Sequence, residues 1–154
     1  MRIIDYKTYV KPTHFLKLEQ GDNRLRIVSE GVICYEHGIV LSNGKYIPMG
    51  TCTEDSKCPQ CRKGNEAKLR YKWIVYSPKT GDVKVLSVGP QVGDEICIIG
   101  KQENKLTFEI NIQRSGLGKQ SRYKVSRVNP TDITTETAVI IKENKDYLFS
   151  KYLT

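Results

Sequence analysis

The sequence predicts a mainly β domain, a small Greek-key barrel or sandwich with a cysteine-rich insertion and a C-terminal helix. Three observations favour this class. Short runs of β-branched and aromatic residues are separated by glycine-containing turns, four of the five cysteines lie between residues 34 and 64, and a helical pattern follows residue 130. Since the 154 residues contain no internal repeat or evident linker, we expect a single domain over residues 1–154.

Five short strands are expected, and four of them form hairpins. The first strand covers residues 25–28, after a turn at residues 21–23. The two hairpins turn at residues 77–82 and 115–118, and their strands cover residues 71–76, 83–88, 106–113 and 123–127. Residues 92–99 fit a short helix as well as a strand.

The last segment, residues 131–154, is expected to be a helical extension. Thr134 or Thr135 can cap this helix, because a threonine hydroxyl accepts a hydrogen bond from an N–H group of the first helical turn. The helical pattern continues through Ile141, and residues 147–149 (Tyr-Leu-Phe) are expected to dock on the rest of the domain.

Basic residues outnumber acidic ones, 25 Lys and Arg against 17 Asp and Glu, for a net charge of +8. The excess lies in residues 57–73 and 101–127, each with a net charge of +5. If both segments line one groove, a polyanionic partner is favoured; if they are separate solvated faces, it is not. Since the chain shows no signal-peptide pattern and no run of 18 apolar residues, we expect an intracellular protein that does not span a membrane.

The cysteines point to a metal site rather than to disulfides, since their number is odd and no secretion signal is evident. Cys58 and Cys61 form a CxxC pair, whose two intervening residues let both thiolates face one ion. Cys52 and His37 complete a closed tetrahedral set of the structural zinc type. We therefore expect one structural Zn²⁺ held by His37, Cys52, Cys58 and Cys61, with Cys34 as an alternative to His37.

An enzymatic role is not expected. A closed ligand set leaves no position for water or substrate, and the H-x-E motif of zinc deaminases is missing, as is a phosphate-binding glycine loop. The CxxC pair also does not follow a strand, as a redox pair does. Cys97, flanked by isoleucines, is expected to be a buried core thiol, and His14 is assigned no function.

Aromatic residues alternate with basic ones at residues 45–46, 70–73 and 122–124. This pattern is typical of single-stranded nucleic-acid binding, because bases stack on exposed rings while Lys and Arg hold the phosphates. The alternative is that the rings belong to the core, since Tyr71 and Trp73 share one face of their strand. Both interpretations are open at this point.

The cysteine-rich segment resembles the zinc segment of the helix-destabilising, single-stranded DNA-binding proteins of T-even phages. The similarity rests on His37-Gly38, residues 43–47 (Asn-Gly-Lys-Tyr-Ile), Cys52 and the pair Cys58 and Cys61. The strands and turns downstream follow the same order as in that family, so that the resemblance covers roughly residues 12–128.

The resemblance implies a five-stranded OB-fold barrel with a zinc-binding subdomain at residues 34–64. It also implies sequence-independent binding of single-stranded DNA, which protects it during viral DNA replication, recombination and repair, with replication or recombination proteins as partners. The expected nucleic-acid-binding residues are Arg24, Arg26, Lys45, Tyr46, Arg70, Tyr71, Lys72, Trp73, Tyr76, Lys84, Arg114, Lys119, Arg122, Tyr123 and Lys124.

The sequence departs from two features of the family, a basic N-terminal arm for cooperative binding and an acidic C-terminal tail that recruits partners. Only a few residues precede the expected first strand, and residues 128–154 carry four acidic residues and three lysines. Cooperativity and recruitment by those routes are therefore not expected. The alternative function is a zinc-stabilised RNA-binding or protein-interaction module of a replication or transcription complex.

Overall fold

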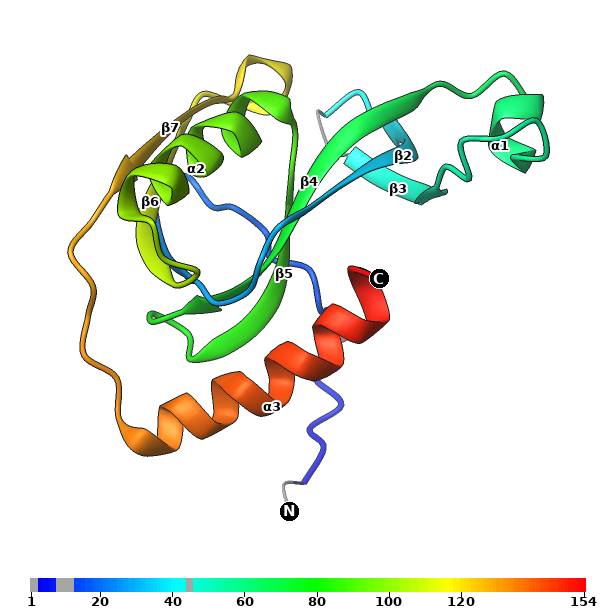
Figure 1. Cartoon of the computed structure of the whole chain (residues 1–154). Helices are drawn as coiled ribbons and strands as arrows, with labels where there is room; N and C mark the ends of the chain where they lie inside the picture. The colour runs from blue at the N-terminus through cyan, green and yellow to red at the C-terminus, as the bar shows by residue number, and fades with distance from the viewer. Residues whose placement is uncertain (1–2, 8–12, 44–45) are drawn as a thin grey trace.

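The computed structural model describes residues 3–7, 13–43 and 46–154. They form seven strands in one sheet, three α-helices and a short 3₁₀ helix (Figure 1). The elements are β1 (Gly21–Ile27), β2 (Val32–Val40), β3 (Tyr46–Thr51), α1 (Pro59–Arg62), β4 (Ala67–Ser77), β5 (Asp82–Val88), α2 (Pro90–Glu103), β6 (Phe108–Ser115), η1 (Gly118–Gln120), β7 (Arg122–Arg127) and α3 (Thr135–Tyr152).

The sheet is antiparallel, with the strand order β3-β2-β4-β1-β6-β7 and with β5 paired to β4. The long strand β4 holds the sheet together, because its first half pairs with β2 and its second half with β1 and β5. The mainly β class and the C-terminal helix are confirmed. The sheet is not closed, so the expected five-stranded barrel is not confirmed.

Two of the strands, β2 and β3, lie in the cysteine-rich segment, where the sequence shows little periodicity. The sequence analysis does not expect these two strands. The reason is visible in β2, which buries the polar side chains of Glu36 and His37 and exposes the apolar side chains of Ile33 and Tyr35. Hydropathy therefore does not report burial along this strand. Elsewhere, residues 21–23 belong to β1 rather than to a turn, and residues 92–99 are helical.

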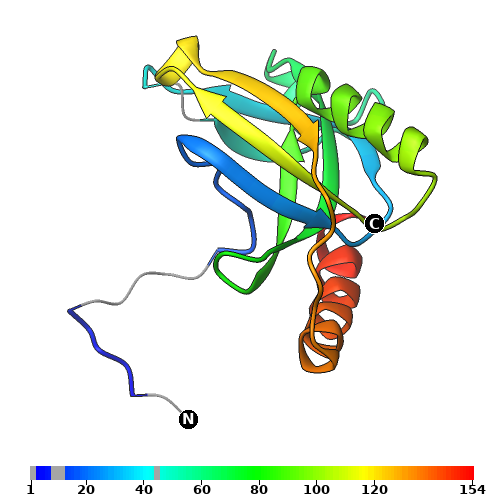
Figure 2. The same ribbon diagram turned by 90° about the vertical axis from the view of Figure 1, so that its left-hand side faces the viewer.

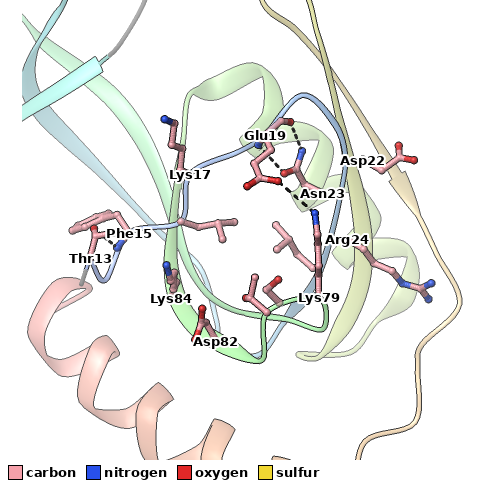
Figure 3. A pocket seen from close by; sticks show the side chains of 14 residues that line it. Thr13, Phe15, Lys17, Glu19, Asp22, Asn23, Arg24, Lys79, Asp82 and Lys84 are labelled. Atoms are coloured by element: carbon pink, nitrogen blue, oxygen red, sulfur yellow. Dashed lines mark hydrogen bonds and ion pairs between the residues drawn. The ribbon is translucent and has the colours of Figure 1, made fainter. Parts of the chain in front are cut away.

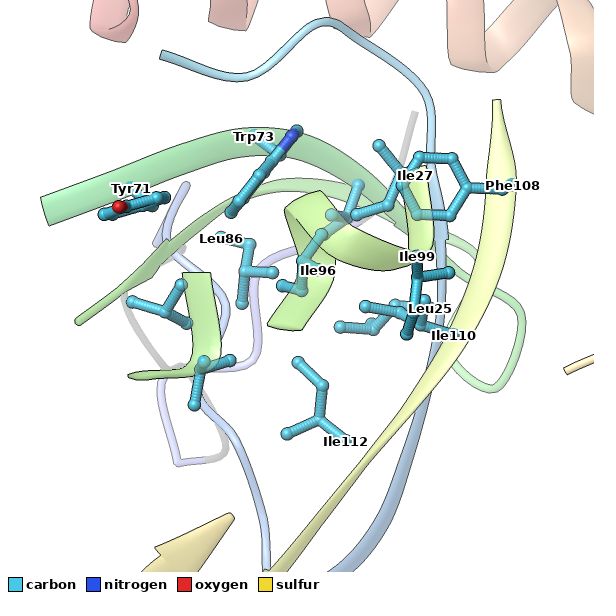
Figure 4. Packing of buried hydrophobic residues seen from close by; sticks show 13 residues of the cluster. Leu25, Ile27, Tyr71, Trp73, Leu86, Ile96, Ile99, Phe108, Ile110 and Ile112 are labelled. Carbon is cyan, nitrogen blue, oxygen red and sulfur yellow. The ribbon is translucent and has the colours of Figure 1, made fainter. Parts of the chain in front are cut away.

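The main core lies between α2 and one face of the sheet (Figure 4). Val92, Ile96 and Ile99 are spaced three to four residues apart and therefore form one face of α2. This face packs among buried residues from the strands: Leu25, Ile27, Tyr71, Trp73, Val75, Leu86, Val88, Phe108, Ile110 and Ile112.

The C-terminal helix α3 docks on the sheet, as expected. Thr134 is its N-cap, and the threonine hydroxyl accepts a hydrogen bond from the N–H of Thr137 at 3.1 Å. Leu148 is buried in a second apolar cluster beneath the helix, whereas Tyr147, also expected to dock, is 55% exposed. Figure 2 shows residues 128–134 running from the end of β7 to the start of α3.

β2, β3, α1 and the first half of β4 project away from the rest of the molecule (Figure 1). We call this projection, residues 32–40 and 46–72, the arm. It joins the core through β4, whose residues 71–77 lie in the main body of the sheet. Among the described residues, no helix has the length and apolar character needed to cross a membrane.

Candidate functional site

One histidine and three cysteines meet in the arm. His37 lies on β2, Cys52 follows β3, and Cys58 and Cys61 lie at α1. Their ligand atoms all lie within 4.8 Å of one another. The Sγ atom of Cys52 is 3.8 Å from that of Cys58 and 3.6 Å from that of Cys61, and His37 Nε2 is 3.3 Å and 3.4 Å from the same two sulfurs.

These distances fit the edges of a metal-centred tetrahedron. With zinc–sulfur bonds of about 2.3 Å and zinc–nitrogen bonds of about 2.0–2.1 Å, the edges are about 3.8 Å between sulfurs and about 3.6 Å between sulfur and nitrogen. His37, Cys52 and Cys58 are buried, while Cys61 is exposed at the rim. The cluster can therefore hold one metal ion through four protein ligands.

The local sequence explains how the two cysteines of the CxxC pair come together. Cys58 immediately precedes the single turn of α1 and Cys61 lies within it, so that both sulfurs lie on one side of the turn. Pro59 occupies the first helical position, where its fixed φ angle suits the helix and its missing N–H costs nothing. Gly64, with φ of +80°, then lets the chain turn away toward β4.

The thiols of Cys58 and Cys61 have different affinities for protons. Hydrogen bonds from the backbone of Cys61 and of Thr53 lower the pKa of Cys58 to about 5. Hydrogen bonds with the side chains of Cys52 and Cys58 raise the pKa of Cys61 to about 11, because a second thiolate beside the first is unfavourable. Since thiolates are the metal ligands, binding of a cation displaces the remaining protons.

The other two cysteines lie outside the cluster. Cys34 is not among its members, so the residue that joins the three cysteines in the cluster is His37 and not the alternative Cys34. Cys97 was expected to be a buried core thiol, and this expectation is wrong, since Cys97 is exposed on α2. In a helix, neighbouring residues point in different directions, so Ile96 is buried while Cys97 and Ile98 face outward.

Two expected nucleic-acid-binding residues instead form a buried ion network. Lys72 Nζ lies 3.0 Å from Glu36 Oε1, and both side chains are about 6% exposed. Arg70 Nε lies 3.9 Å from Glu36 Oε2 and 3.2 Å from the hydroxyl of Ser87. Because Lys72 neutralises a buried carboxylate, its structural role argues against the expected phosphate contact.

Arg24 and Arg26 form a second network around Glu109, which is 1% exposed. Arg26 Nε lies 3.3 Å from Glu109 Oε1, and Thr131 donates to both Glu109 oxygens at 2.6 Å through its N–H and its hydroxyl. Both arginines also donate to backbone carbonyls of the segment that follows β7, at Asn129 and Thr131. The network fastens that segment to the sheet.

The expected stacking of Tyr71 and Trp73 on bases does not agree with their burial, at 8% and 6% exposure. Both rings lie in the main core (Figure 4). The hydroxyl of Tyr71 donates to Asp94 Oδ1 on α2 at 2.6 Å, and this hydrogen bond raises the pKa of Tyr71. The interpretation as core aromatics, which the sequence leaves open, is therefore the correct one for these two residues.

The remaining expected contact residues fall into three groups. Arg122 and Lys124 are exposed on β7. Tyr76, Lys84, Arg114 and Tyr123 are half-buried, and Arg114 donates to the carbonyl of Leu18 at 2.8 Å. Lys45 lies outside the described residues, as do the side chains of Tyr46 and Lys119.

A pocket of about 200 Å³ lies between residues 13–25 and the turn that joins β4 to β5 (Figure 3). Its charged lining residues are Lys17, Glu19, Asp22, Arg24, Lys79, Asp82 and Lys84. Lys79 forms an ion pair with Glu19 at 3.6 Å. The near balance of charges gives the pocket no clear preference for an anion.

The sequence analysis does not single out the apolar residues that the structure exposes on the arm, which are Ile33, Tyr35, Ile39, Val40 and Met49. A signal for Ile33 and Tyr35 is present in the sequence. Side chains alternate between the two faces of a strand, so residues two and four positions before His37 share its face. A strand through His37 therefore places Ile33 and Tyr35 on the same face as His37.

We compared the chain with models of known protein families, with curated proteins and with solved structures, and none of the three comparisons finds a match.

Proposed function

We propose that this protein is a non-catalytic, sequence-independent binder of single-stranded DNA that is stabilised by one structural zinc ion. The observation that carries the proposal is the cluster of His37, Cys52, Cys58 and Cys61 on the arm. It has the residue types and spacing of the zinc segment that the sequence resembles, that of the T-even phage helix-destabilising proteins. The proposed role is to protect unpaired strands in viral DNA replication, recombination and repair.

Zinc is the proposed ion because of the donor set. Three thiolates and one imidazole suit zinc, which favours four-coordinate tetrahedral sites and has no redox chemistry of its own. The ligands come from β2, from the end of β3 and from α1, so the ion would join three segments of the arm. With all four positions taken by protein, its role is to stabilise the arm.

The order of the remaining elements supports an OB-fold as the body of the protein. Without the arm, the chain runs through β1, β4, β5, α2, β6 and β7, and β1 pairs with both β4 and β6. Three strands, a helix and two strands is the order of an OB-fold, which is a partly open barrel. The net charge of +8 adds the attraction to a polyanion that such binding requires.

The test is a binding titration of the zinc-loaded protein, followed by fluorescence anisotropy, with labelled single-stranded DNA, single-stranded RNA and duplex DNA of the same sequence. We expect tightest binding to single-stranded DNA, similar affinity for different base compositions, and a linear fall of log K with log[salt]. A preference for duplex or for structured RNA would contradict the proposal and favour an RNA-binding module.

A further inference from the structure

Apolar side chains continue from the core onto one face of the arm. Ile33 pairs across the sheet with Tyr71, and Tyr35 pairs with Leu69. Because residues directly opposite each other in a sheet share a face, these four side chains form one stripe, which we call the apolar stripe. Tyr71 and the half-buried Leu69 pack in or against the main core, so the stripe begins at the core and runs outward.

The outer end of the apolar stripe is open to solvent. α2 covers Tyr71, since Gly93 of this helix packs directly on the tyrosine ring. Beyond the helix, Ile33 is 61% exposed and Tyr35 is 44% exposed. Ile33 and Tyr35 are therefore two large apolar side chains exposed at neighbouring positions on the same face of β2.

The charged residues of β2 and β4 lie on the face of the arm opposite the apolar stripe. Glu36, Arg70 and Lys72 alternate with Tyr35, Leu69 and Tyr71 along β2 and β4, so they lie on the opposite face. Lys57, Arg62, Lys63 and Lys68 are exposed elsewhere on the arm. The arm also exposes Glu54, Asp55 and Glu66, but its basic residues outnumber its acidic ones. It can therefore attract a polyanion, while the face of β2 and β4 that carries the stripe has no charged side chain.

We infer that the apolar stripe contacts the unpaired bases of single-stranded DNA, and that Tyr35 is the residue on which a base stacks. This inference rests on the proposed function and adds to it a base-contacting surface. A tyrosine ring held on a paired strand loses little freedom when it stacks, and the π-face of any base fits it, which agrees with binding independent of sequence. A second copy of this chain is a poorer occupant, because two basic arms would be brought together.

The test compares Tyr35→Ala, Tyr35→Phe and Ile33→Thr with the wild type in titrations with an oligothymidylate over a series of salt concentrations. Tyr147→Ala is the matched control, since Tyr147 is another exposed tyrosine, 55% exposed on α3. We expect Tyr35→Ala to weaken binding about 5- to 150-fold, the effect of losing one base–aromatic stack, and Ile33→Thr to weaken it less. Tyr35→Phe and Tyr147→Ala should bind as the wild type does.

The salt dependence separates stacking from phosphate contact. Loss of a stack leaves the slope of log K against log[salt] unchanged, whereas loss of a phosphate contact makes it shallower. If Tyr35→Ala binds as tightly as the wild type, the inference is overturned and the proposed function stands. The same holds if the slope of log K against log[salt] is shallower in Tyr35→Ala than in the wild type. Absence of binding by the wild type would instead overturn the proposed function.

Folding and self-association need their own measurements. Zinc content and melting temperature should be the same in all variants, since both mutated side chains in the arm are exposed. If Tyr35→Ala fails to fold, the DNA affinity of Ile33→Thr is compared with that of the wild type instead, and equal affinity overturns the inference. Sedimentation velocity of the free protein measures its oligomeric state. If Tyr35→Ala changes the oligomeric state and leaves the DNA affinity unchanged, the apolar stripe is a protein contact and the inference is overturned.

Discussion

Replacing Gly93 by alanine tests how α2 packs on β4 at the junction between core and arm. A Cβ atom placed on Gly93 lies 2.3 Å from Cγ and 2.8 Å from Cβ of Tyr71, far inside van der Waals contact. Tyr71 has little room to withdraw. Its strand pairs with β2 on one edge and β5 on the other, and its hydroxyl is held by Asp94.

Two effects of this substitution oppose each other. Alanine is favoured over glycine within a helix by about 1 kcal/mol, whereas overpacking a core costs about 1–3 kcal/mol. Gly100 of the same helix is the matched control, because a Cβ there lies 3.2 Å from two ring atoms of Phe108, a contact that a small shift relieves. Since the helix preference cancels in the comparison, Gly93→Ala should be less stable than Gly100→Ala by about 1–3 kcal/mol.

For a domain of this size, the difference corresponds to about 2–12 °C in melting temperature. It can be measured by thermal unfolding of the two metal-loaded variants, followed by circular dichroism. If Gly93→Ala melts at the same temperature as Gly100→Ala, α2 does not pack on Tyr71 as described.

Three further predictions concern the metal, a tyrosine and a buried carboxylate. Cys58→Ser, or a chelator added to the wild type, should release the metal and lower the melting temperature, whereas Cys34→Ser should change neither; elemental analysis and a melt measure both. Because the hydrogen bond to Asp94 raises the pKa of Tyr71 above its usual 10.0, the stability from that bond is present below that pH and is lost as pH rises through the raised pKa. Melting temperatures from about pH 8 to about pH 11 should therefore fall more steeply in the wild type than in Tyr71→Phe. Glu109→Ala should cost about 3–5 kcal/mol in urea unfolding, since it leaves arginine charge unpaired, and Glu109→Gln should cost less.

The members of the His/Cys cluster were predictable from the sequence because the chemistry of a metal site is local. Cys58 and Cys61 have the spacing that lets two thiolates face one ion, and the odd cysteine count argues against disulfides. Cys52 and His37 required only a search of the neighbouring segment for the missing ligands. The sequence analysis already favoured His37, but excluding the alternative Cys34 required the structure, because the pairing of β2 with β3 and β4 decides which side chain reaches the cluster.

The basic and aromatic residues were much less predictable. Arg26 and Lys72 look like phosphate-binding residues in the sequence, but each pairs with a buried carboxylate that is 83 or 36 residues away along the chain. Tyr71 and Trp73 share one strand face, as alternation predicts, but only the packing of α2 shows that this face is buried. Tyr35 shows the reverse case, an aromatic residue left exposed because no helix covers its end of the arm.

By itself the sequence determined the mainly β class, the C-terminal helix with a cap at Thr134 or Thr135, and the members of the His/Cys cluster. Each depends on residues close together in the chain, through hydrophobic period, capping and ligand spacing. Tertiary structure alone decided that the sheet stays open, that Arg26 and Lys72 are neutralised by buried carboxylates, and that Ile33 and Tyr35 remain exposed on the arm. These outcomes depend on which distant segments pack together, because burial and ion pairing are properties of a surface that forms only when those segments meet.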